Sequence, residues 1–336
     1  GLIMATYKEI KGTQIEVLSS DPSNPVEGQV WYNSTSNVLK GQGATTSGAW
    51  SSTPSLNTAR DQVAGAGTTT SGLVFGENFG GETEFYNGSS WSEQNDLNTS
   101  RRALAGAGAL GTAALAFAGN LAAPSPNAAS NATEKWNGTN WTNVNNLNLA
   151  RSFAAGTGTN TAALCIGGAA GSGGNPPVTA DTESWNGTNW TEVADLNTAR
   201  NDGGAGGITT SALAFGGFKD SGGSPEYFAG TESWNGSTWT AVNNLNTARR
   251  SLGGAGSDNT ACVAFGGDPG SGAVGITEVW NGTNWTEQGD MANARGLMGS
   301  TKGSSTAAMA MGGADTTHVE TFSGAGSPTT VTFTDS

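Results

Sequence analysis

The sequence predicts an all-β protein built from six copies of one four-stranded unit. Two observations lead to this prediction. The motif Leu-Asn-Thr-Ala-Arg and its variants recur along the chain at intervals of 41 to 50 residues. The segments between them are rich in Gly, Thr and Asn, which disfavour helices. The motif ends at Arg60, Arg101, Arg151, Arg200, Arg249 and Arg295.

A second marker, Trp-Asn-Gly-x-x-Trp, occurs in four of the repeats, and Tyr86 with Trp91 is a variant. Because Gly adopts positive φ without penalty, Asn-Gly between two apolar residues is a strong hairpin signal. We expect the second tryptophans and the repeat arginines to be structural. With one tryptophan that precedes the first repeat, the series is Trp50, Trp91, Trp141, Trp190, Trp239 and Trp285.

The third marker is an apolar run that ends in Gly-Gly, and the three markers keep one order in every repeat. Each piece fits a short strand or a turn. In the fourth repeat the expected strands are residues 203–207, 211–215, 231–234 and 239–242. Four short antiparallel strands with a period of 40 to 50 residues describe a blade of a β-propeller. The Gly- and Ala-only first strand belongs at the crowded axis, where only small side chains fit.

The two ends of the repeat region predict how the ring closes. The sixth copy has Phe322 in place of the first tryptophan and no second tryptophan nearby, whereas Trp50 precedes the first copy. We therefore expect the strand of Trp50 to complete the blade that begins at Arg295, which gives a six-bladed propeller. The alternative is a seventh, N-terminal blade made of residues 15–18, 30–33 and 38–40.

The repeat resembles the kelch repeat, which has a basic residue, a hydrophobic run closed by two glycines, and then an aromatic residue and a tryptophan separated by a short turn. The resemblance covers about residues 50–324. It implies a kelch-type β-propeller closed by strands from both termini. Two copies depart from the pattern, with Gly76-Glu77 and Ala118-Gly119 in place of two glycines.

The N-terminal segment suggests a second resemblance. Residues 21–40, which include Val-Trp-Tyr-Asn-Ser-Thr-Ser-Asn-Val-Leu-Lys, resemble segments common in tail-fibre and other structural proteins of bacteriophages, especially marine ones. The segment reads as a hairpin with a polar turn. We expect residues 1–45 to be a tether or capping hairpin, residues 46–326 the propeller, and residues 327–336 a C-terminal strand or tail.

Composition argues against several classes of function. The net charge is −13, and the 14 basic residues are spread over the repeats rather than clustered as phosphate binding requires. No apolar run approaches the roughly 18 residues of a membrane helix. We therefore expect neither nucleic-acid binding nor membrane insertion. Cys165 and Cys262 lie in repeats that are not neighbours in a ring, so we expect no disulfide.

The sequence also contains no cluster of potentially catalytic residues that breaks the repeat. One histidine, His318, and four tyrosines are too few and too dispersed for a copper or zinc site. Every repeat arginine has a matching glutamate, which favours a structural Arg–Glu contact over ligand binding. The glutamates are Glu84, Glu134, Glu183, Glu232, Glu278 and Glu320. We expect no cofactor, no metal and no enzymatic activity.

The loops between the second and third strands vary most, and we expect them on the same face as the Leu-Asn-Thr-Ala-Arg connections. Variable loops on a rigid scaffold are where binding usually occurs. One loop gathers aromatic and charged residues. The candidate binding residues are Phe218, Lys219, Asp220, Glu226, Tyr227 and Phe228.

These observations favour a non-enzymatic phage virion component, namely a tail fibre, appendage or decoration protein. The expected partners are other virion proteins and a host-surface glycan or protein, and the expected location is the virion. The alternative is a kelch protein-interaction module in the cytoplasm of a cell.

Overall fold

The computed structural model describes residues 15–22, 29–42, 47–77, 80–121, 128–171, 177–220, 222–325 and 330–333. Every regular element in these residues is a strand. Among them is no helix of the length and apolarity that crossing a bilayer requires. The chain divides into two compact units, residues 48–324 and residues 1–47 with 325–336.

In its described residues, the larger unit contains six antiparallel sheets of four or five strands, here numbered I to VI, and two short two-stranded pairings. Sheets I to V are each built from strands that follow one another in sequence, whereas sheet VI also includes a strand from the start of the unit. Sheet I contains β5 (Ala64–Thr68), β6 (Ser71–Phe75), β7 (Thr83–Tyr86) and β8 (Trp91–Glu93). Sheet II contains β10 (Ala105–Leu110), β11 (Ala113–Phe117), β13 (Thr133–Trp136) and β14 (Trp141–Val144). Sheet III contains β15 (Arg151–Ser152), β16 (Ala155–Gly158), β17 (Ala163–Ala170), β18 (Val178–Trp185) and β19 (Trp190–Val193).

The remaining three sheets repeat the pattern. Sheet IV contains β20 (Gly204–Ile208), β21 (Ser211–Phe215), β24 (Thr231–Trp234) and β25 (Trp239–Val242). Sheet V contains β26 (Gly253–Asp258), β27 (Ala261–Phe265), β28 (Thr277–Trp280) and β29 (Trp285–Glu287). Sheet VI contains β30 (Gly299–Ser300), β31 (Ala307–Met311), β32 (Val319–Ser323) and β4 (Ala49–Thr53). Three of the four strands expected in the fourth repeat have the predicted bounds, and β20 is displaced by one residue.

Sheet VI joins the two ends of the larger unit. Strand β4 pairs antiparallel with β32, and Trp50 lies directly opposite Phe322. The two rings are 5.3 Å apart between centroids. The expected pairing of the Trp50 strand with the last repeat is therefore confirmed.

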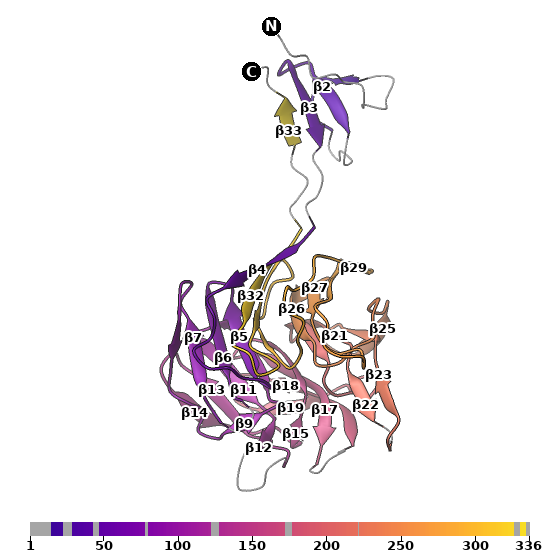
Figure 1. Ribbon diagram of the computed structural model, residues 1–336. Coiled ribbons are helices and arrows are strands. Elements are labelled where there is room, and N and C mark those ends of the chain that lie inside the picture. Colours follow the sequence, from indigo (N-terminus) through magenta and orange to yellow (C-terminus); the bar gives the residue numbers. More distant parts are fainter. Residues whose placement is uncertain are drawn as a thin grey trace. The chain divides into compact units, whose positions relative to one another are not determined.

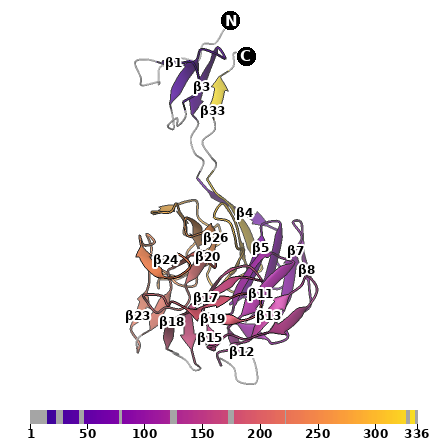
Figure 2. The same cartoon turned by 180° about the vertical axis from the view of Figure 1, so that it is seen from behind.

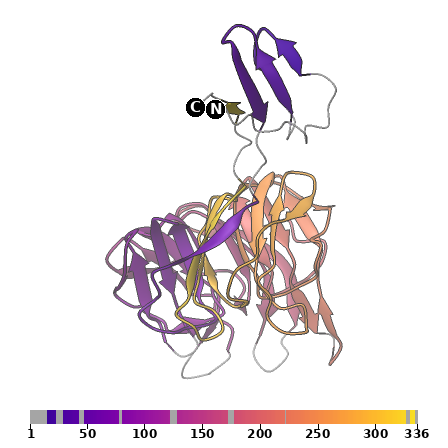
Figure 3. The ribbon, with the colours of Figure 1, turned by 45° about the horizontal axis from the view of Figure 1, so that its top comes forward.

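The innermost strands of the six sheets contact one another in a closed series. Strand β5 contacts β10, and the series continues through β16, β20, β26 and β30 back to β5. In Figure 2, β20 and β26 lie toward the middle of this unit, and in both Figures 1 and 2 β7 lies at its outside. Figure 3 brings the top of the same ribbon forward. This all-β arrangement is compatible with a β-propeller.

Glycine allows the inner strands to approach closely. A Cβ atom on Gly106 would lie 2.9 Å from the carbonyl oxygen of Gly65 in the preceding sheet. A Cβ atom on Gly156 would lie 2.7 Å from the carbonyl oxygen of Gly106. One on Gly254 would lie 2.8 Å from the carbonyl oxygen of Ala205. These separations are shorter than real Cβ contacts, so a side chain at these positions would push neighbouring sheets apart. The Gly- and Ala-rich first strands therefore match the crowding that we expected.

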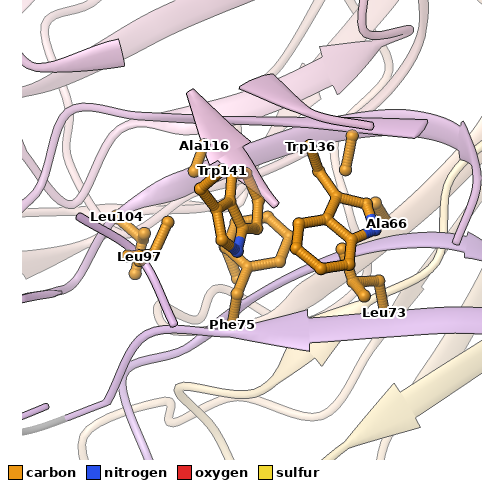
Figure 4. Packing of buried hydrophobic residues seen from close by; sticks show 10 residues of the cluster. Ala66, Leu73, Phe75, Leu97, Leu104, Ala116, Trp136 and Trp141 are labelled. Atoms are coloured by element: carbon orange, nitrogen blue, oxygen red, sulfur yellow. The ribbon is translucent and has the colours of Figure 1, made fainter. Parts of the chain in front are cut away.

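The hydrophobic core lies between adjacent sheets. Phe75 of sheet I packs edge-on against Trp141 of sheet II, with 4.9 Å between ring centroids (Figure 4). Within the hairpin of sheet II, Trp136 and Trp141 are 5.3 Å apart. Because each core cluster joins neighbouring sheets, the fold buries its few large apolar residues at the boundaries between repeats.

The Asn-Gly hairpins form as predicted. In sheet IV, the Oδ1 atom of Asn235 accepts hydrogen bonds of 2.9 Å from the backbone N–H groups of Ser237 and Thr238. Gly236 follows with a φ of 93°, a conformation that favours glycine. This turn places Trp234 opposite Trp239.

The smaller unit is a separate sheet of β1 (Glu16–Leu18), β2 (Val30–Asn33), β3 (Val38–Gln42) and β33 (Thr330–Phe333). Strands β2 and β3 form the expected hairpin, whereas β1 pairs parallel with β2, and β33 pairs with β3. The strands proposed for a seventh blade thus belong to this sheet and to none of the six sheets of the larger unit.

One carboxylate organises the smaller unit. Asp21 accepts hydrogen bonds from Trp31 Nε1 at 3.1 Å and Asn33 Nδ2 at 2.7 Å. It also forms an ion pair of 2.6 Å with Lys40 Nζ. Lys40, Asn33 and Trp31 together lower the pKa of Asp21 to about 2. Trp31 is completely buried, so this polar cluster fixes its indole in the sheet.

Candidate functional site

Each repeat arginine forms a buried ion pair with the glutamate of its own repeat. The Nη2 atom of Arg60 lies 2.5 Å from Oε1 of Glu84, and both side chains are inaccessible to solvent. Glu84 also accepts a 2.8 Å hydrogen bond from the backbone N–H of Asn57. The pair therefore fixes the connection that enters the repeat. The equivalent pairs are Arg101–Glu134, Arg151–Glu183, Arg200–Glu232, Arg249–Glu278 and Arg295–Glu320.

The residues two positions after these arginines share an unusual backbone conformation. All six have φ between 49° and 57°, although none is glycine. Such left-handed residues cost roughly 1–2 kcal/mol each and are often found at functional sites. We call this set the rim; its members are Gln62, Ala103, Phe153, Asp202, Ser251 and Leu297.

Backbone hydrogen bonds join the rim residues from one repeat to the next. The N–H of Ala103 donates to the carbonyl of Gln62 at 2.8 Å, and that of Phe153 donates to Ala103 at 2.8 Å. The series continues through Asp202 and Ser251 at 2.9 and 2.8 Å. It reaches the last rim residue, Leu297, at 3.0 Å. This continuous series explains why six different residue types adopt the same strained conformation.

The rim surrounds a small cavity of about 90 Å³. Its wall is completed by the residue that follows each rim residue, for example Leu104 and Leu252. The rim presents an amide, a carboxylate, a hydroxyl and apolar groups on an identical backbone. Burial raises the pKa of Asp202 to about 6, against an opposing effect of Arg250. Sequence reasoning missed the rim because left-handed backbone at non-glycine residues leaves no compositional signal.

The candidate binding loop of sheet IV forms a two-stranded hairpin of β22 (Phe218–Asp220) and β23 (Pro225–Tyr227). The ring centroids of Phe218 and Tyr227 are 5.3 Å apart. The guanidinium carbon of Arg250 lies 4.6 Å from the Phe218 centroid and 5.7 Å from that of Tyr227. Arg250 also pairs with Asp268 at 3.5 Å. The structure thus assembles an aromatic pair capped by a cation.

The other candidate residues are placed around this cluster. Lys219 lies opposite Glu226 on the hairpin, and both are accessible. Asp220 accepts a 2.7 Å hydrogen bond from the N–H of Gly223 and so fixes the turn. Phe228 lies apart, with the guanidinium carbon of Arg200 5.6 Å from its ring centroid. Arg250 was missed in the sequence, where the doubled Arg249-Arg250 was the available signal.

The hairpin and the rim lie on the same side of the larger unit. Asn201, which follows a repeat arginine, exchanges backbone hydrogen bonds of 3.0 and 2.8 Å with Phe218. In the fifth repeat, Arg250 and Asp268 exchange the equivalent backbone hydrogen bonds. In the second repeat, β9 (Arg101–Arg102) pairs with β12 (Asn120–Leu121) in the same way. The expected common face of the variable loops and the arginine connections is therefore confirmed, although the candidate hairpin residues do not line the rim cavity.

The histidine, the cysteines and the acidic side chains that could bind a metal ion or act as nucleophiles are dispersed over the described residues. Among the described residues, no group of three or more His, Cys, Asp or Glu side chains is arranged to hold a metal ion. His318 is exposed, and Cys165 and Cys262 are buried free thiols. Glu77 lies beside Glu82, and burial together with this neighbouring carboxylate raises the pKa of Glu77 to about 7.

Comparison with known proteins gave no relative from which to transfer a role to these residues. No protein-family model matches the chain, and the search of curated proteins found no significant match.

Proposed function

We propose that residues 48–324 form a six-bladed kelch-type β-propeller that binds a glycan on the face carrying the rim and the β22–β23 hairpin. The closed series of inner-strand contacts and the pairing of β4 with β32 support the blade number. The kelch assignment rests on the repeat motif. In this proposal the chain is a binding protein and catalyses no reaction.

The observation that carries the proposed binding role is the chemical divergence of one face on a repeated scaffold. The arginines and their glutamates recur in all six repeats and the Asn-Gly hairpin turns in five, whereas rim side chains and the adjoining loops differ. A site for a particular ligand must break the repeat, because six equivalent surfaces cannot present one asymmetric arrangement. The cluster of Phe218, Tyr227 and Arg250 is such a break.

A glycan suits this cluster chemically. Sugar rings present apolar C–H faces and polar hydroxyl edges, and they bind to accessible aromatic faces flanked by hydrogen-bonding groups. Phe218 and Tyr227 are partly exposed, and Lys219, Glu226 and Asp268 supply charged groups nearby. The net charge of −13 favours a neutral or cationic ligand over a polyanion at long range.

We further propose that the chain is a component of a phage virion, in which the smaller unit attaches the propeller to other virion proteins. The resemblance of residues 21–40 to phage structural proteins supports this assignment. The competing proposal is a cytoplasmic kelch module that docks a cellular protein. Mass spectrometry of purified particles distinguishes them, since the chain should be abundant in virions, and its absence would contradict the viral role.

A glycan array with the labelled full chain tests the ligand class. The double variant Tyr227→Ala/Arg250→Gln should lose binding by at least tenfold. A matched control is Leu110→Ala/Ile208→Ala, which alters exposed side chains at the ends of β10 and β20 away from the rim. Equal binding by both variants would contradict the proposed site, and absence of binding by the unaltered chain would contradict a glycan ligand.

A further inference from the structure

Sheet VI departs from all five other repeats at two positions in or next to its inner strand. Seven residues after the arginine, the first five repeats have glycine, whereas the sixth has Lys302. Five residues after the arginine, the other repeats have glycine or alanine, whereas the sixth has Ser300. The glycines at the position of Lys302 are Gly67, Gly108, Gly158, Gly207 and Gly256. A lysine thus replaces a glycine that the other five repeats share.

Lys302 has a defined position. Its Nζ atom donates a 3.1 Å hydrogen bond to Oγ of Ser300, which in turn donates a 3.0 Å hydrogen bond to the carbonyl of Gly254. The backbone N–H of Lys302 donates to the carbonyl of Gly67 at 3.1 Å. Both substituted residues of sheet VI therefore act together, and they connect its inner strand to sheets V and I.

The side chain of Lys302 lies where two cavities meet. One is an inner cavity of about 80 Å³, lined by the inner strands of all six sheets. The second, which we call the turn-side cavity, has a volume of about 230 Å³ and lies at the turns between first and second strands. This is the opposite end of the inner strands from the rim. Its lining comprises Thr68, Thr69, Ala109, Lys302, Gly303, Ser304 and Ala307.

Lys302 is the only charged residue in the lining of either cavity within the described part of the chain. None of the ion pairs formed by the described residues includes it. Burial without a compensating carboxylate lowers the pKa of its ammonium group to about 8. An ammonium has three donors. The single hydrogen bond to Ser300 leaves donors available to a ligand.

The hydroxyl groups of the turn-side cavity add further donors. Oγ of Ser304 accepts hydrogen bonds from the backbone N–H groups of Thr306 and Ala307 at 3.2 and 3.1 Å. Oγ1 of Thr68 likewise accepts the N–H of Ser71 at 3.1 Å. Each oxygen also lies within hydrogen-bond distance of a second hydroxyl, Thr306 at 3.3 Å and Thr70 at 3.4 Å, and either oxygen can be the donor. When those threonines donate, Ser304 and Thr68 can offer their own hydrogen atoms to a ligand. A cation beside hydroxyl donors is suited to an anion rather than to a neutral or cationic group.

We propose that Lys302, with Ser304 and Thr68, binds a small oxyanion in the turn-side cavity. The ligand is a phosphate or carboxylate, either free or as the terminal group of a larger molecule. The cavity is smaller than the roughly 300–1,000 Å³ typical of drug-sized ligands, which agrees with a small ionic group. This site lies at the opposite end of the inner strands from the proposed glycan face and does not depend on it.

The test uses the full chain labelled with ¹³C at lysine Cε, titrated with inorganic phosphate or acetate at pH 7 and constant ionic strength. The six lysines are Lys8, Lys11, Lys40, Lys135, Lys219 and Lys302. The signal of Lys302, identified by its loss in Lys302→Gly, should shift saturably while the other five stay unchanged. The anion with the lower dissociation constant distinguishes a phosphate from a carboxylate ligand. Uniform shifts of all lysines, or none, would overturn the proposal.

Thermal unfolding of unlabelled protein provides the second measurement. Phosphate or acetate should raise the melting temperature of the unaltered chain and of the control Lys135→Met. The rise should be absent in Lys302→Gly, which carries the residue of the other repeats, and in Lys302→Met, which retains the length of the side chain. Equal rises in all four proteins would place anion binding elsewhere and overturn the proposal.

Discussion

The indole Nε1 of Trp141 donates a hydrogen bond of 3.0 Å to the hydroxyl of Thr83, across the boundary between sheets I and II. Both residues are buried. The same bond joins other boundaries, through Trp190 and Thr133, Trp285 and Thr231, and Trp50 and Thr277. Each of these sheets is therefore connected to its neighbour by a specific polar contact as well as by apolar packing.

Thr83→Val should destabilise the protein by about 1–3 kcal/mol, because it leaves a buried indole N–H without an acceptor. Thr182→Val is the matched control: Thr182 occupies the equivalent position of sheet III, and its buried hydroxyl has no hydrogen-bond partner. That variant should be neutral or slightly stabilising. Denaturant unfolding measures both, and equal effects would show that the bond to Trp141 contributes nothing.

Breaking one buried Arg–Glu pair should be costly. Arg101→Met leaves Glu134 charged and buried, which should cost about 3–5 kcal/mol in the free energy of unfolding. The double variant Arg101→Met/Glu134→Leu should recover much of this loss, because it removes both desolvated charges. Chemical denaturation measures the two variants. The backbone N–H of Asn98 donates a 2.6 Å hydrogen bond to Glu134. If the double variant is as unstable as the single one, loss of this hydrogen bond, rather than an unpaired buried charge, accounts for the destabilisation.

A methyl group on an inner-strand glycine should separate two sheets. In Gly106→Ala the new Cβ atom would lie 2.8 Å from the Phe75 ring and 2.9 Å from the Gly65 carbonyl. We expect a loss of about 1–3 kcal/mol from overpacking. Gly72→Ala, with its nearest contact at 3.4 Å, should be neutral or stabilising because it restricts the unfolded chain. Similar melting temperatures for the two variants would argue against close contact of the inner strands.

The smaller unit should lose stability in acid through Asp21. Its pKa is about 2 in the folded chain and 3.8 in a model compound, so the folded state favours the ionised form. This contribution is fully present above pH 3.8 and is lost as the pH falls through 2. The indole N–H signal of Trp31 in NMR spectra should report this titration and should lose it in Asp21→Asn. A midpoint near 4 for Asp21 would contradict the proposed hydrogen-bond cluster.

Much of the larger unit was predictable because its signals are local. The strands of residues 211–215, 231–234 and 239–242 were predicted at their actual bounds. An apolar run closed by Gly-Gly marks the first, and a tryptophan beside the Asn-Gly turn marks one end of each of the other two. Strand β20 was displaced by one residue, because glycine carries no alternation of side chains. The Arg–Glu contacts were predictable because each repeat contains one such arginine and one such glutamate, always in the same order.

Several features that depend on contacts between different repeats or segments were not predictable, although the pairing of the Trp50 strand with the last repeat was. The parallel pairing of β1 with β2 was not predicted, because the sequence pattern indicated only the hairpin of β2 and β3. The β22–β23 hairpin lacked the Asn-Gly signal, and the capping of Phe218 by Arg250 joins two repeats. The rim depends on hydrogen bonds between neighbouring repeats, so no single segment of sequence encodes it.

The central claim is that six sheets close around one axis, with β4 and β32 completing the last. An experimental structure of the full chain, by crystallography or electron cryo-microscopy, tests it most directly. We predict six sheets in a closed ring, with Trp50 opposite Phe322 and against Phe265 of sheet V. An open arrangement of the sheets, a seventh sheet in the ring, or β4 paired with another strand would contradict the account.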